Sequence, residues 1–220
     1  MSVELEAQEK VVLDIVQDYL SKNRQFDIDD IIPYINFHLK RNSINLNYEG
    51  IKAILISLVK KKYLIEGSKL THEDILKNDN RNTIYNHILK NPGIYFSKIV
   101  KDLGYSNHVV VWHLNILIKF NYVKKRILDN YEVYFDSDVN PYHAQLNFYL
   151  SHEKIKEIIQ YLRNDNTGIT KTKLSRNLKM HLNTISKYLR ILQKFKLILE
   201  EKIDNQLLYF LREDFLIQYS

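Results

Sequence analysis

The sequence contains an internal repeat of 75 residues, which limits the possible folds more than any other feature. Gly93-Ile94 aligns with Gly168-Ile169, and the register holds without a gap as far as Tyr134-Phe135, which aligns with Tyr209-Phe210. The matched apolar pairs between these ends are Ile99 and Leu174, Leu103 and Leu178, Val110 and Ile185, Leu114 and Leu189, Leu117 and Leu192, Phe120 and Phe195, and Val123 and Ile198. Because self-similarity at a fixed period indicates a repeated structural unit, we expect two copies of one small fold.

Each copy predicts three helices followed by a β-hairpin. Apolar residues at helical spacing predict helices over Asn82–Lys90, Phe96–Leu103 and Asn107–Phe120, and over His152–Arg163, Thr170–Leu178 and Leu182–Phe195. The pattern then changes to β-prone runs at Tyr122–Leu128 and Tyr131–Asp136, and at Leu197–Ile203 and Gln206–Arg212. The connecting Asp-Asn pairs suit hairpin turns, since both residue types tolerate left-handed backbone. The predicted fold is mainly α with small β-wings (α+β), as tandem winged-helix units.

A third and weaker copy is expected at residues 4–76. Apolar faces there predict helices that include Val11–Leu20, Ile28–Leu39 and Tyr48–Lys61. The segment Leu64–Leu70 is too short for two good strands, so we interpret this copy as a degenerate winged helix that forms a packing or partner surface. The predicted domains are residues 1–78, 79–140 and 141–220, two clear winged-helix units after one degenerate unit.

An apolar segment connects the two clear copies. Residues 140–150 include Tyr142, Leu146 and Phe148, and with the helix that follows they predict a helical spacer over residues 141–163. Its apolar residues either bury against the neighbouring wings or form a dimer contact. A homodimer or a protein partner is therefore expected through this helix or through the N-terminal unit.

The positive charge lies in the last two-thirds of the chain. Residues 1–78 carry 11 Lys and Arg against 12 Asp and Glu, whereas residues 79–220 carry 21 against 14. A basic excess confined to one region favours a polyanionic partner, and the alternative is a solvated lysine-rich surface. The 220-residue chain has no cysteine, no apolar signal segment near Met1 and no apolar run long enough to span a membrane, so we expect a cytoplasmic protein.

The sequence carries no positive sign of an enzyme. With 5 Gly in 220 residues it lacks the glycine-rich loops that hold phosphates, and none of the common catalytic motifs occurs. His108 and His113 are five residues apart on one helix, so they cannot chelate a metal as an i, i+4 pair would. We interpret His113 as a partly buried histidine beside Trp112. We predict no catalytic residue, no metal site and no cofactor.

The first clear copy resembles archaeal winged helix-turn-helix transcriptional regulators. The resemblance rests on Ile88–Phe96, on Ile99, Leu103-Gly104 and Ser106, and on Trp112-His113-Leu114, and it extends over residues 79–215. That family often carries two such units in tandem, and it implies binding of double-stranded DNA on the archaeal nucleoid. Winged helices also serve as protein-interaction modules, as in subunits of ESCRT-II and of basal transcription factors, so the fold leaves that alternative open.

The architecture implies which residues would contact DNA. In a winged helix, the second helix of the turn motif enters the major groove and the wing lies along the backbone. The candidate base-reading residues are Asn107, His108 and Val111 in the first copy and Asn183, Thr184 and Lys187 in the second. The second copy is the better candidate, since residues 168–196 hold eight basic residues and no acidic one. The candidate backbone contacts are Lys124, Lys125, Arg126, Lys171, Lys173, Arg176, Lys179 and Arg190.

Overall fold

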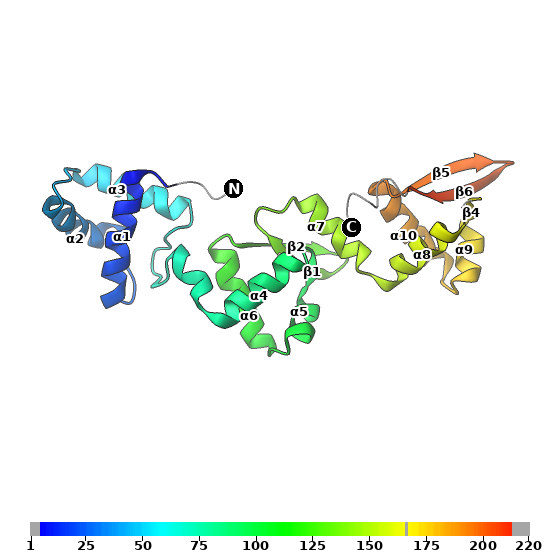
Figure 1. The fold of residues 1–220 in the computed structure, drawn as a ribbon, viewed down its shortest axis with the longest axis horizontal. Coiled ribbons are helices and arrows are strands. Elements are labelled where there is room, and N and C mark those ends of the chain that lie inside the picture. The colour runs from blue at the N-terminus through cyan, green and yellow to red at the C-terminus, as the bar shows by residue number, and fades with distance from the viewer. Residues whose placement is uncertain (1–4, 166, 213–220) are drawn as a thin grey trace. The chain divides into compact units, whose positions relative to one another are not determined.

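The computed structural model describes residues 5–165 and 167–212. The chain divides into two compact units, Met1–Asn140 and Pro141–Ser220 (Figure 1). The ends of the first and last predicted domains, at residues 1–4 and 213–220, lie outside the described residues. The division into three domains stays a prediction.

The first unit begins with three helices around an apolar core. They are α1 (Ala7–Lys22), α2 (Ile28–Arg41) and α3 (Tyr48–Lys60). The first two cover the helices predicted there, and α3 ends one residue before the predicted Lys61. Their apolar faces share one cluster of buried side chains, including Ile31 and Leu55. No strand follows α3 within the described part of this segment, where the 3₁₀ helix η1 (His72–Lys77) leads to the next helix. The predicted absence of a wing is confirmed.

The rest of the first unit has the winged-helix order. Its elements are α4 (Asp79–Lys90), β1 (Ile94–Tyr95), α5 (Phe96–Leu103), α6 (Asn107–Lys119), β2 (Val123–Leu128) and β3 (Tyr131–Asp136). The sheet has the antiparallel order β1-β3-β2, with Ile94 paired to Tyr134. The turn residues Asp129 and Asn130 have φ angles of 48° and 69°, which a two-residue hairpin of this hand requires. Sequence periodicity missed β1, because two residues are too few to show alternation.

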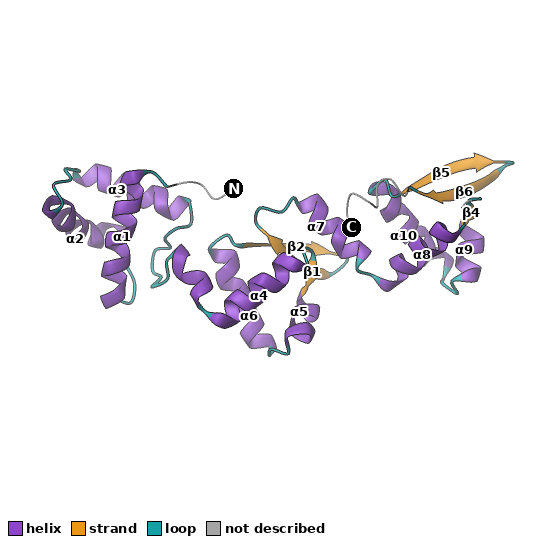
Figure 2. Ribbon diagram, viewed as in Figure 1, coloured by secondary structure: helices purple, strands orange, loops and turns teal. Residues whose placement is uncertain are grey.

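The second unit repeats this arrangement. Its elements are α7 (Pro141–Leu150), α8 (Glu153–Asn164), β4 (Ile169–Thr170), α9 (Lys171–Asn177), α10 (Leu182–Lys194), β5 (Ile198–Ile203) and β6 (Gln206–Leu211). Its strands β4, β5 and β6 (Figure 2) form a sheet of order β4-β6-β5. Within it, Ile169 pairs with Tyr209. Thus two small three-stranded sheets each accompany a helix-turn-helix, and the predicted fold class is confirmed.

The helical spacer predicted over residues 141–163 is not one continuous helix. Two helices occupy this segment, since α7 ends at Leu150 and α8 begins at Glu153. The Ser151 hydroxyl donates to the Phe148 carbonyl at 2.7 Å, and the His152 Nδ1 lies 2.8 Å from the same oxygen. Such side-chain bonds compete with the helical ladder and end α7 here. Tyr142 and Tyr149 of α7 pack against Phe195 within the unit. A dimer contact through this segment stays a prediction.

Candidate nucleic-acid interface

Helix α10 separates an apolar face from a polar one. The side chain of its N-cap residue, His181, accepts the backbone N–H of Asn183 at 3.2 Å, which fixes the start of the helix. The apolar side chains at i, i+4 and i+7 are buried and anchor the helix; they are Ile185, Leu189 and Leu192. The same spacing places Asn183, Lys187 and Arg190 together on the exposed side, with Thr184 half-buried beside them.

Basic residues continue from α9 into the turn before α10. Lys173 and Arg176 are exposed on α9, and Lys171 at its start is half-buried. Lys179 lies in the turn with a φ of 51° and is also exposed. The Lys173 ammonium is 3.7 Å from the Asp165 carboxylate, a partly exposed pair of little strength. The helix-turn-helix of the second unit therefore presents cations on both of its helices.

The equivalent helix of the first unit, α6, has a different exposed surface. The Ser106 hydroxyl caps it by accepting the N–H of Val109 at 3.4 Å. Asn107 and His108 are exposed in its first turn, and Val111 is 44% exposed further along. Lys119, its last residue, is the one Lys or Arg in the helix. An α-helix with this surface is suited to apolar contact more than to phosphate.

Two residues of this region were not predicted as functional. Trp112 on α6 is 56% exposed, and the guanidinium carbon of Arg81 lies 5.7 Å from the centre of its ring. Arg81 itself, from the first turn of α4, is buried with 3% exposure. Helical spacing could have shown that Trp112 lies away from the buried face of α6. The burial of Arg81 depends on neighbours that are remote in sequence.

His113 lies on the buried side of α6. It is 3% exposed, and its Nδ1 has no hydrogen-bond partner among the described residues. Its ring centre is 4.7 Å from that of Trp112. Burial, followed by the positive charge of Arg81, lowers the pKa of His113 below its ordinary value, so the ring is neutral. The side chain is thus more buried than the sequence interpretation expected.

The wing of the first unit carries three consecutive cations on β2. Lys124, Lys125 and Arg126 are all exposed, but strand alternation places Lys125 on the opposite face from the other two. The Lys125 ammonium pairs with Glu132 at 2.7 Å, and the Lys124 ammonium donates to the Ser137 carbonyl at 2.6 Å. Arg126 makes no ion pair with any described residue. It is the best placed of the three for a phosphate.

The wing of the second unit has the opposite character. In β5 the exposed residues include Glu200 and Glu201, where the first wing has Lys125 and Arg126. Leu199 is 44% exposed and Ile203 is 43% exposed. Carboxylates at these positions would repel a phosphate backbone. The candidate contacts of the second unit therefore lie on its two turn-motif helices, whereas those of the first unit are divided between α6 and the wing strand β2.

Among residues 5–165 and 167–212, no group of three or more His, Asp and Glu side chains is arranged to hold a metal ion. No helix in the described part of the chain is both long and apolar enough to cross a membrane.

One curated protein aligns with most of the chain, whereas no protein-family model matches it. The relative is an uncharacterised HTH-type transcriptional regulator of Methanocaldococcus jannaschii, 28% identical over 194 residues. The alignment covers 84% of this chain and 49% of the relative, so the chain spans about half the length of the curated relative it matches. The chain is thus a distant homologue of an archaeal helix-turn-helix regulator.

Proposed function

We propose that this chain is a sequence-specific DNA-binding transcriptional regulator. Helix α10 enters the major groove, where Asn183, Thr184 and Lys187 contact base edges. The cations of α9 and of the following turn, together with Arg190, contact phosphates on either side. Arg126 of the first wing likewise contacts a phosphate of the DNA backbone. A regulator of this kind binds double-stranded DNA and carries out no reaction.

The observation that carries the proposal is the exposed surface of the second helix-turn-helix. A buried apolar face anchors α10, while the amide of Asn183, the ammonium of Lys187 and the guanidinium of Arg190 lie on its exposed face. Amide and guanidinium groups match the donors and acceptors of purine edges, and lysine reaches either a guanine or a phosphate. No acidic residue lies between residues 168 and 196 to oppose a polyanion. The distant relative, whose name is that of a transcriptional regulator, supports the same function.

Salt-dependent binding to duplex DNA tests the proposal. If the protein neutralises roughly 4–8 phosphates, its affinity falls by orders of magnitude between about 50 and 200 mM salt. Fluorescence anisotropy with a labelled duplex measures this slope, and selection from a random pool identifies a preferred site. Affinity that is flat with salt, or a pool that yields no enriched sequence, would contradict a sequence-reading regulator.

A second candidate function is a protein-interaction scaffold. The exposed apolar surface of α6, with Val111 at 44% and Trp112 at 56% exposure, favours it for the first unit. The same anisotropy series separates the candidates, since a scaffold would bind duplex DNA weakly at about 50 mM salt.

A further inference from the structure

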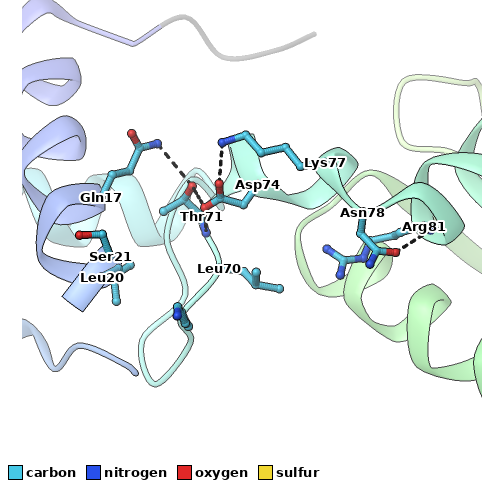
Figure 3. A pocket seen from close by; sticks show the side chains of 10 residues that line it. Gln17, Leu20, Ser21, Leu70, Thr71, Asp74, Lys77, Asn78 and Arg81 are labelled. Atoms are coloured by element: carbon cyan, nitrogen blue, oxygen red, sulfur yellow. Dashed lines mark hydrogen bonds and ion pairs between the residues drawn. The ribbon is translucent and has the colours of Figure 1, made fainter. Parts of the chain in front are cut away.

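A cleft of about 550 Å³ in the first unit lies between α1 and the segment that leads into α4 (Figure 3). Leu20 and Leu70 contribute apolar surface, and Gln17 and Thr71 contribute polar groups. The Gln17 amide donates to the Thr71 hydroxyl at 3.4 Å and to the Glu73 carboxylate at 3.0 Å. A concave site with apolar walls and a few placed polar groups is typical of small-molecule binding.

Arg81 lines this cleft as a buried cation, and no carboxylate of the described residues pairs with it. Its Nη1 donates to the Ile75 carbonyl at 2.9 Å, whereas its Nε is buried without a hydrogen-bond partner among the described residues. The carboxylate of Asp74 also lines the cleft, but it accepts hydrogen bonds from Thr71 and Lys77 and not from Arg81. Burying a charge without a paired counter-charge is costly, so an anion at Arg81 would be strongly stabilised.

The free side of this guanidinium determines the kind of anion. Because Nη1 is bonded to Ile75, the Nε and Nη2 groups remain, and their parallel N–H bonds match the two oxygens of a carboxylate. Figure 3 shows the Arg81 side chain extending from α4 toward Leu70. Lys69 adds positive charge to the lining, whereas the charge of Lys77 is paired with Asp74. We propose that the cleft binds a small organic carboxylate. Arg81 pairs with the carboxylate group, and the apolar part of the molecule packs against Leu20 and Leu70.

The fluorescence of Trp112 can report whether the cleft is occupied. Trp112 is the single tryptophan of the sequence, and its ring lies 5.7 Å from the Arg81 guanidinium carbon. A carboxylate that pairs with Arg81 changes the charge beside the indole. Its fluorescence should therefore change with occupancy.

Titration of the full chain with single compounds tests the proposal. The probes are propanoate, succinate and L-glutamate, with inorganic phosphate and neutral methyl propanoate for comparison, each up to about 50 mM at constant ionic strength. We expect a saturable change in Trp112 fluorescence with at least one carboxylate, the same affinity by calorimetry, and no response to the ester. A response to phosphate alone, or to none of the three carboxylates, would overturn the proposal.

Two kinds of variant localise the binding. Arg81→Lys keeps the charge but removes the two-pronged donor, so the carboxylate affinity should fall at least about tenfold, or 1.4 kcal/mol. Ser21→Tyr fills the cleft from α1 without altering Arg81 and should cause a similar loss.

Ser151→Tyr is the matched control. Each serine is exposed near the end of a helix and donates to the carbonyl three residues earlier, Ser21 at 2.6 Å and Ser151 at 2.7 Å. Ser151→Tyr should leave the response unchanged. If circular dichroism shows that Arg81→Lys is unfolded, the carboxylate affinities of Ser21→Tyr and Ser151→Tyr decide whether this cleft is the binding site. Equal affinities for the two tyrosine variants would exclude this cleft as the site.

Discussion

The two winged-helix units have equivalent buried positions, but one carries its positive charge on the wing and the other on the helix-turn-helix. At the repeat distance of 75 residues, Trp112 of α6 corresponds to Lys187 of α10, and Arg126 of β2 corresponds to Glu201 of β5. The first unit thus has a basic wing and an apolar helix, and the second has a basic helix and an acidic wing. Core positions are constrained by packing, whereas exposed positions are free to differ. The two copies of one repeated fold thus present different exposed side chains at equivalent positions.

A glycine substitution tests the packing of the repeated winged-helix fold. Gly168 precedes β4 with a φ of 80°, and an added Cβ would lie 2.3 Å from the Phe210 ring. Gly168→Ala should lower the free energy of unfolding of the second unit by about 2–4 kcal/mol, from left-handed strain plus overpacking. Gly104→Ala is the control, because its φ is 66° but its surroundings are open, and it should cost about 1–2 kcal/mol. Urea unfolding measures both, and equal losses would mean that Phe210 moves aside.

The basic helix should carry the largest effect on DNA binding. Replacing Lys187 and Arg190 together with alanine should weaken binding to a selected site by roughly 10- to 100-fold, with a smaller loss on a scrambled duplex. The control variant replaces Lys154 and Arg163 of α8, which removes the same charge from another exposed helix of the unit. Fluorescence anisotropy compares the two. If both variants lose the same affinity on both duplexes, α10 does not read sequence.

The wings should respond in opposite directions. Arg126→Ala should weaken binding to every sequence by roughly three- to tenfold and reduce the salt slope by about one, because a phosphate contact carries no base information. Glu201→Arg places the same charge at the equivalent position of the second wing and should strengthen binding. Salt titrations of both variants measure these changes. A sequence-dependent loss in Arg126→Ala would argue for base contact by the wing.

The apolar helix should have the smallest effect on DNA binding. Trp112→Ala removes the exposed ring from α6 and should change DNA affinity by less than about threefold, since this helix presents little charge to a phosphate. The same anisotropy assay measures it, with circular dichroism to confirm folding. A tenfold loss would show that both helices contact DNA and would remove the contrast between the units.

Most of the fold could be predicted because it depends on periodic local patterns. The spacing of Val110, Leu114 and Leu117 predicts the buried face of α6, and the Asp129-Asn130 pair predicts the hairpin turn. The break at Ser151 and His152 was missed, because both side chains are compatible with a helix until they bond the Phe148 carbonyl. The candidate DNA contacts follow from the repeat and the charge pattern, and they stay predictions until binding is measured.

The repeat, the order of the elements and the places where basic residues gather could all be predicted from the sequence. The order of the elements depends on neighbours within a few residues, where helical and strand periods act. Folding alone pairs Lys125 with Glu132 while no described residue forms an ion pair with Arg126. Folding also buries Arg81 beside Trp112, with an Nε that bonds to no described residue. Burial and pairing are properties of segments brought together by folding. For that reason the cleft beside Arg81 is evident in the structure and had no sign in the sequence.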